Sequence, residues 1–114
     1  MTERIQEFLR SRRNEGQDVE PCLVVDLEVV RDNYQTFAKA LPDSRVFYAV
    51  KANPASEVLS LLASMGSCFD TATVAEIEMA LAAGATPDRI SYGNTIKKER
   101  DIARAFALGI RLFA

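Results

Sequence analysis

The 114-residue sequence has no histidine and only two cysteines, Cys22 and Cys68, which lie far apart along the chain. Zinc sites in proteins are built mainly from histidine and cysteine at short spacings, so this composition argues against a zinc site. Two distant cysteines do not form a disulfide scaffold, and they fit a reducing compartment better than an oxidising one. We therefore expect a cytoplasmic protein without a bound metal.

The sequence also lacks long apolar runs and clusters of positive charge. No segment approaches the ~18 apolar residues that suggest a membrane-spanning helix, and residues 1–16 are charged throughout, unlike a secretory signal. The net charge is −2, and the one group of arginines, Arg10, Arg12 and Arg13, fits a solvated helix face. We expect neither a membrane nor a nucleic acid as a partner.

What the sequence does contain is 48% hydrophobic residues, enough for the core of one modest domain. Residues 1–20 predict an amphipathic helix and a polar linker. Thereafter strand-like runs alternate with helical patterns. The expected strands are "CLVVD", "RVFYAVK", "SCFDTA", "RISYG" and "IRLFA", and the expected helices cover 27–40, 56–65, 74–83 and 97–108. Strands that are apolar on both faces suit a parallel sheet covered by helices, so the predicted class is α/β.

The expected helices carry start and stop signals. Residues suited to the N-cap precede four of them: Asp26, Asn53, Thr73 and Thr95. Pro54 follows Asn53 at the favoured first helical position, and Thr73 and Glu76 have the spacing of a capping box. Glycines suited to the left-handed position after a helix follow three of them: Gly66, Gly84 and Gly109.

Two architectures fit this alternation. An open sheet of five strands would make 114 residues a complete domain, whereas a (β/α)8 barrel needs about 250 residues. The sequence stops at Ala114 inside an apolar strand, and an uncovered apolar edge invites aggregation. We therefore expect an N-terminal fragment, in which residues 21–114 form the first half of a barrel, truncated after four to five parallel strands.

One lysine ends the most strand-like segment, "VFYAVKANP". Because side chains alternate along a strand, Phe47, Ala49 and Lys51 are expected to share one face. Barrels of this kind build their active sites at the carboxyl ends of the strands. From the pattern alone, Lys51 is either a solvent-exposed residue at the end of the strand, the commoner case, or an amine that forms a Schiff base.

Three blocks of sequence resemble a known family. "FYAVKAN" resembles the pyridoxal-phosphate lysine motif of the fold-type III decarboxylases, and "CFDTATVAEIEMAL" resembles their "FDCAS-x-x-E(I/L)" segment. "PDRISYGNTIKKERDIARA" resembles their "P-x-R-I-x-(Y/F)-A-N-x-x-K" segment. The resemblance is to the ornithine/lysine/arginine decarboxylase branch, and most of all to bacterial ornithine decarboxylases. The sequence departs from the pattern at Thr71 and Thr73, where Cys and Ser are usual, and at "GNTIK", where "ANPCK" is usual.

The resemblance implies an alanine-racemase-like barrel that binds pyridoxal 5′-phosphate and decarboxylates a basic amino acid, L-ornithine first and L-lysine second. Lys51 would carry the cofactor as a Schiff base, with Ala49 beside the cofactor and Asp70 holding the lysine ammonium and polar groups of the ring. Ala49 equally fits simple filling of the barrel, and Asp70 also fits a helix-capping or loop aspartate. The full-length protein would be a homodimer with a C-terminal β-domain, and this fragment alone would be inactive. The alternatives are a non-catalytic barrel protein (a cofactor carrier or a regulator), a diaminopimelate decarboxylase, and an open-sheet binding domain without a cofactor.

Four further residues near these blocks have ordinary structural explanations. For Glu76 the capping box is favoured over a role behind Asp70. Asn94 and Lys97 fit a solvent-exposed loop, and Cys68 fits a small core residue better than a nucleophile. Which basic amino acid is the substrate stays open at this point.

Overall fold

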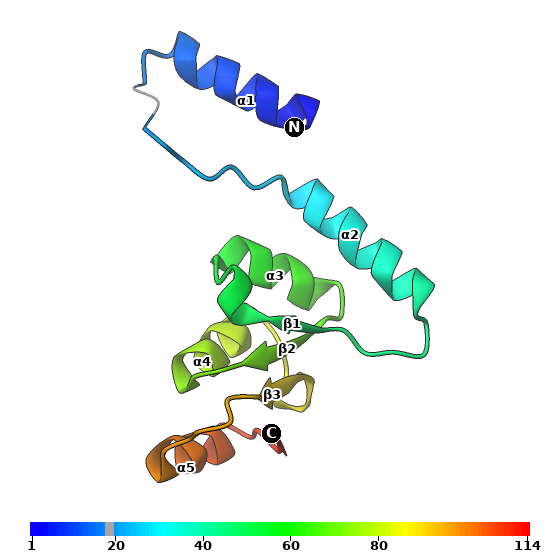
Figure 1. Cartoon of the computed structure of the whole chain (residues 1–114), viewed down its shortest axis with the longest axis vertical. Coiled ribbons are helices and arrows are strands. Elements are labelled where there is room, and N and C mark those ends of the chain that lie inside the picture. Colours follow the sequence, from blue (N-terminus) through cyan, green and yellow to red (C-terminus); the bar gives the residue numbers. More distant parts are fainter. Residues whose placement is uncertain (18–19) are drawn as a thin grey trace.

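The computed structural model describes residues 1–17 and 20–114, and Figure 1 shows its elements in order along the chain. The helices are α1 (Glu3–Asn14), α2 (Leu27–Ala40), α3 (Ser56–Ser64), α4 (Val74–Ala82) and α5 (Glu99–Ala107). The strands are β1 (Phe47–Ala49), β2 (Cys68–Thr71), β3 (Ile90–Tyr92) and β4 (Leu112–Phe113). Two short 3-10 turns, η1 (Val50–Ala52) and η2 (Pro87–Arg89), lie between them. The alternation of strand and helix from β1 onward confirms the α/β class.

The four strands form one parallel sheet in the order β1-β2-β3-β4. Its register pairs Ala49 with Asp70, and Asp70 with Ser91. Partners in a parallel register point to the same side, so these three side chains lie on one face of the sheet. Helices α3, α4 and α5 make the connections between successive strands, as parallel pairing requires.

The hydrophobic core lies between α3–α5 and the face of the sheet opposite Asp70. Phe69, Ile90 and Tyr92 point into it and are 0–2% exposed. They pack with apolar residues of the three helices, among them Leu59, Ile77 and Ala105. The rings of Tyr48 and Phe69 meet edge to face, with centroids 6.4 Å apart. The face that bears Ala49, Asp70 and Ser91 takes no part in this core and stays half-buried.

Helices α3, α4 and α5 end in the same hydrogen-bonded turn. In each, the amide after the glycine donates to the carbonyl five residues earlier: Ser67 to Leu62, Ala85 to Ala80, and Ile110 to Ala105. The glycines Gly66, Gly84 and Gly109 have positive φ values of 91°, 105° and 94°. These are Schellman motifs. The predicted glycine stops are therefore confirmed.

Two of the predicted N-caps are confirmed. Asp26 Oδ1 accepts a hydrogen bond from the Glu28 amide at 3.0 Å, and Thr73 Oγ1 accepts one from the Glu76 amide at 3.1 Å. The Glu76 carboxylate reaches back as a capping box requires, but it bonds the amide of Ala72 and not that of Thr73. The Glu76 carboxylate therefore bonds an amide one residue earlier than the capping-box spacing predicts.

The predicted N-caps at Asn53 and Thr95 are wrong. Asn53 Oδ1 accepts from the Ala55 amide at 3.1 Å, which closes a local turn around Pro54 and delays α3 to Ser56. Helix α5 begins at Glu99, after Lys98. The loop before α5 is held by Lys97. Its ammonium bonds the Ala114 carbonyl and lies over the Tyr92 ring, 5.4 Å from the ring centroid.

Two strand predictions also need correction. The segment "CLVVD", residues 22–26, is extended but lies outside the sheet, and Leu23 is 86% exposed. It lies across a cavity from α1, and α2 separates it from the first strand along the chain. The strand predicted over 46–51 ends at Ala49, where η1 begins. Lys51 therefore does not belong to the alternation of β1.

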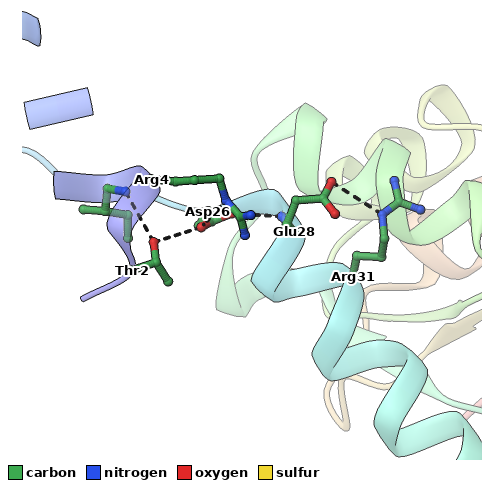
Figure 2. Close-up of polar contacts among 6 residues, drawn as sticks. Thr2, Arg4, Asp26, Glu28 and Arg31 are labelled. Carbon is green, nitrogen blue, oxygen red and sulfur yellow. Dashed lines mark hydrogen bonds and ion pairs between the residues drawn. The ribbon is translucent and has the colours of Figure 1, made fainter. Parts of the chain in front are cut away.

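Helices α1 and α2 are linked by polar contacts at Asp26, shown in Figure 2. Asp26 Oδ2 accepts from Thr2 Oγ1 and from Arg4 Nε, both at 3.0 Å. The hydrogen bond from Arg4 lowers the pKa of the Asp26 carboxyl. One turn further, Glu28 and Arg31 form an exposed ion pair at 3.7 Å. None of the helices in the described part of the chain is long and apolar enough to cross a membrane.

Candidate functional site

A small cavity opens at the carboxyl ends of the first three strands. Its volume is about 170 Å³, and its lining comprises Ala49, Lys51, Asp70, Ala72, Glu76, Gly93, Asn94 and Thr95. The three site residues predicted from sequence, Lys51, Ala49 and Asp70, all border it. They meet because parallel strands bring their carboxyl ends to one edge of the sheet, where α/β folds bind ligands.

Lys51 reaches the cavity from the turn η1. On one side of it, Val50 is fully buried in the core. On the other side, the Tyr48 hydroxyl donates to the Asn53 carbonyl at 3.1 Å. Burial raises the pKa of that hydroxyl above its ordinary value. The turn is thus fixed on both sides, while Lys51 itself is exposed and accessible to a small molecule.

Asp70 supplies a carboxylate from the end of β2. Its Oδ1 accepts a hydrogen bond from Ser91 Oγ, on the neighbouring strand β3, at 2.8 Å. Two residues beyond Ser91, Gly93 passes so close that a Cβ there would lie 2.3 Å from the same oxygen. Ser91 and Gly93 were not among the predicted site residues. A pairing of β2 with β3 in register would have been the signal for them, because they share the face of Asp70.

Four residues for which the sequence suggested structural roles lie in or near the site: Glu76, Asn94, Lys97 and Cys68. Glu76 borders the cavity, but its carboxylate is engaged in capping α4. Asn94 also borders the cavity and is exposed, whereas Lys97 is half-buried against Tyr92. Cys68 is 4% exposed and accepts a hydrogen bond from the Arg45 guanidinium at 3.2 Å, as a small buried residue.

A larger cavity of about 520 Å³ lies between α1 and residues 22–27. Its lining is mainly apolar. Of its charged groups, Arg4 and Asp26 pair with each other, and Arg12 lies over the Phe8 ring. The smaller cavity, by contrast, holds an amine and a carboxylate that reach a ligand space together. In the ranges 1–17 and 20–114, no cluster of three His, Cys, Asp or Glu residues could hold a metal ion.

The chemistry of the smaller cavity follows from its lining. A primary amine such as that of Lys51 condenses with aldehydes. The Asp70 carboxylate is suited to hold a cation or a hydrogen-bond donor. The small side chains of Ala49 and Ala72, together with Gly93, leave room for a flat ring. These groups fit an aldehyde cofactor built on a planar ring.

Known proteins with similar sequences share this region. Residues 27–114 match the family described as "Pyridoxal-dependent decarboxylase, pyridoxal binding domain". Over 93 residues, the chain is 47% identical to the chloroplastic ornithine decarboxylase of Nicotiana glauca. Over a match of the same length, it is 42% identical to the lysine/ornithine decarboxylase of Selenomonas ruminantium. Each match covers 82% of this chain, and they cover 22% and 24% of the respective relatives.

A solved structure shares the architecture. The lysine/ornithine decarboxylase of Vibrio vulnificus, in complex with cadaverine, superposes with a TM-score of 0.85 at 32% identity. The superposition covers 99% of this chain and 30% of that one. The chain thus spans less than a quarter of the length of the two curated relatives named above.

Proposed function

The chain belongs to the fold-type III pyridoxal-phosphate decarboxylases, in the group of the ornithine and lysine decarboxylases, and from this membership we propose that it bears the cofactor lysine of an enzyme that decarboxylates a basic amino acid. Its parallel strands match the N-terminal part of the barrel domain of these proteins, which confirms the fold class. The proposed division is a helix and linker in residues 1–20 and the first half of the barrel in residues 21–114.

The observation that carries the proposal is the meeting of Lys51, Ala49 and Asp70 at one cavity. The proposed substrate is L-ornithine, with L-lysine as the second candidate. The substrate would lose its carboxylate as CO2 and take up a proton at Cα, and the product from ornithine would be putrescine. The naming of both amino acids in relatives' descriptions supports this choice.

Pyridoxal 5′-phosphate is the proposed cofactor, and the amine, carboxylate and small residues of the cavity fit it. When bound, it supplies an aldehyde and a ring that accepts electrons as the bond to the substrate carboxylate breaks. The Lys51 amine would hold it covalently until the amine of the substrate takes its place. Lys51 is then free to hold a proton near the reacting carbon. Asp70 would orient the ring and the lysine ammonium by charge-assisted hydrogen bonds.

We also propose that the protein works as a homodimer in the cytoplasm. The family resemblance supports the dimer. The two free cysteines, Cys22 and Cys68, support a reducing compartment. One relative is named a chloroplastic enzyme, so fractionation of the source cells is the direct measurement of location.

The cofactor role of Lys51 is tested by chemical trapping. The protein made from the complete gene is incubated with pyridoxal phosphate, reduced with borohydride and digested, and the labelled peptides are identified by mass spectrometry. We expect the label on Lys51 at cofactor concentrations that leave the exposed Lys39 unlabelled. Lys51→Arg should abolish the label, and the matched change Lys39→Arg should leave it intact. Equal labelling of both lysines would contradict the proposal.

The reaction is tested on the protein made from the complete gene. Release of CO2 is measured with L-ornithine, L-lysine, L-arginine and meso-diaminopimelate in parallel. We expect the highest kcat/KM with ornithine. A preference for diaminopimelate would replace the proposed substrate. Trapping at Lys51 without release of CO2 from any of the four would point to a non-catalytic carrier or regulator.

A further inference from the structure

The contact between Ser91 and Asp70 lies beside Gly93, a position at which this sequence differs from the family pattern. In "P-x-R-I-x-(Y/F)-A-N", Ser91 occupies a position at which the pattern specifies no residue, and Gly93 stands where alanine is usual. Both positions face the cavity side of β3, next to Asp70. Next to the Asp70 carboxylate, the sequence thus departs from the family pattern at Gly93 and has a hydroxyl at a position that the pattern leaves open.

The hydrogen bond from Ser91 has a preferred acceptor. Ser91 Oγ lies 2.8 Å from Asp70 Oδ1 and 3.5 Å from the Phe69 carbonyl oxygen. A hydroxyl has one proton to donate, and a carboxylate at the shorter distance is the stronger acceptor. The proton of Ser91 therefore goes to Asp70, which leaves the second carboxylate oxygen for a ligand.

The backbone that carries Ser91 and Gly93 is held against β2. The Gly93 amide donates to the Thr71 carbonyl at 2.8 Å. The Thr71 hydroxyl, at another position where the sequence departs from the family pattern, donates to the Ser91 carbonyl at 2.6 Å. With this backbone fixed, a Cβ at position 93 would overlap Asp70 Oδ1 at 2.3 Å. In the observed arrangement, Asp70 Oδ1 thus accepts the Ser91 hydrogen bond and occupies space that a side chain at position 93 would fill.

We propose that Ser91 is a positioning residue for pyridoxal phosphate binding, which fixes the Asp70 carboxylate toward the cavity in the space that Gly93 leaves open. The inference rests on the proposed function, because it assumes that Asp70 meets the cofactor held by Lys51. Ser91 itself acts through Asp70 and need not touch the cofactor.

The first experiment measures the affinity for pyridoxal phosphate, by absorbance titration, of the protein made from the complete gene. Ser91→Ala should weaken binding by about tenfold, the size expected when one hydrogen bond to a charged group is lost. Ser91→Thr keeps the hydroxyl and should restore most of the affinity. Ser64→Ala makes the same atomic change on an exposed turn of α3 and should leave the affinity unchanged. Equal affinity of Ser91→Ala and the unchanged chain would overturn the inference.

Gly93→Ala tests the steric half of the inference. The added methyl should displace the carboxylate and weaken binding even though Ser91 is still present. A double-mutant cycle with Asp70→Ala then separates positioning from a general structural effect. If Ser91 acts through Asp70, Ser91→Ala should cause no further loss of affinity in the Asp70→Ala background. A further loss of the same tenfold size would contradict the inference.

A third measurement needs no cofactor. The carboxyl 13C resonance of Asp70 should move in Ser91→Ala and in Gly93→Ala, and it should stay close to its original position in Ser91→Thr and Ser64→Ala. This measurement separates the proposed function from the positioning role of Ser91. If the resonance moves as expected but pyridoxal phosphate is not trapped at Lys51, the proposed function fails. If Lys51 is trapped but Ser91→Ala changes neither the resonance nor the affinity, the positioning role fails.

Discussion

Residues 47–114 contain the buried core, whereas the preceding helices α1 and α2 lie outside it. The first region contains a buried core, with Phe69, Ile77 and Ile90 at most 1% exposed. Neither α1 nor α2 contains a buried residue. Helix α2 contacts the core through half-buried side chains such as Val30 and Tyr34, and α1 contacts α2 through polar groups at Asp26. Figure 1 shows the same contrast, with α1 lying apart from the sheet and α3–α5 close to it.

This difference indicates that the buried core is what holds the candidate site rigid. Lys51 and Asp70 both belong to the region with the buried core, and each adjoins a fully buried residue, Val50 and Phe69 respectively. Burial of apolar surface is the larger stabilising force, whereas polar contacts at a surface contribute little. The geometry of the site should therefore be insensitive to the position of α1.

The largest effect should come from removing the centre of the core. Phe69→Ala should lower the free energy of unfolding by about 3–5 kcal/mol, because it deletes a fully buried aromatic ring and leaves a cavity. Chemical denaturation followed by circular dichroism measures this change. Leu112→Ala is the matched control on the same sheet, because Leu112 is 51% exposed and should cost less than about 1 kcal/mol. Equal losses from both changes would remove the distinction between the two faces of the sheet.

An intermediate effect is expected at the turns that end the helices. Gly84→Ala places a side chain at φ 105°, with no atom near the new Cβ. It should cost about 1–2 kcal/mol from backbone strain alone. Gly109→Ala adds a contact with Pro87 at 3.1 Å to a similar strain, so it should cost more. Denaturation midpoints of the two variants give the comparison. Equal losses for the two variants would show that Pro87 moves aside without cost, and a smaller loss for Gly109→Ala than for Gly84→Ala would contradict the expected order.

The smallest effect should be confined to α1. The pKa of Asp26 is lowered chiefly by the hydrogen bond from Arg4, so the folded pKa lies below that of the unfolded chain, about 3.9. Its contribution to stability is therefore complete above about pH 4 and is lost as the pH falls through the folded pKa. Amide NMR shifts of α1 should change in that range, while those of β1–β4 stay constant.

A pair of substitutions tests the same contact at neutral pH. Asp26→Asn removes the charge with which Arg4 pairs but keeps a side-chain oxygen that can cap α2. Only the contact of α1 with α2 should therefore be lost. Glu28→Gln changes an exposed carboxylate whose partner is Arg31, and it should leave α1 in place. If Asp26→Asn also shifted the amides of Lys51 and Asp70, the two regions would be coupled and the contrast between them would break.

Much of the fold could be predicted because its signals are local. The caps Asp26 and Thr73 and the glycine stops depend on neighbouring residues of the same turn, and they are confirmed. The predictions that failed depend on competing local hydrogen bonds or on residues distant in the sequence. Asn53 caps its own turn and not α3. Whether "CLVVD" becomes a strand depends on whether another strand lies beside it, which the segment itself does not specify.

The candidate site shows the same division. The motifs indicated Lys51, Ala49 and Asp70. The parallel register brings Ala49 and Asp70 together, and the turn η1 places Lys51 at the same cavity. Ser91 and Gly93 had no motif of their own, and their relation to Asp70 depends on the pairing of β2 with β3. The position of Lys51 in a turn was also missed, because alternation along a strand gives no sign of where the strand ends.

The three identical turns at Gly66, Gly84 and Gly109 have a consequence for how such a chain evolves. Each closes one helix with the same hydrogen bonds and directs the backbone into the next strand. A gene exchange whose breakpoints fall at two of these glycines would replace one strand and its helix and leave the direction of the chain unchanged. The glycines thus mark joints at which one strand and its helix could be exchanged without redirecting the chain, provided that contacts between units, such as that of Ser91 with Asp70, are kept.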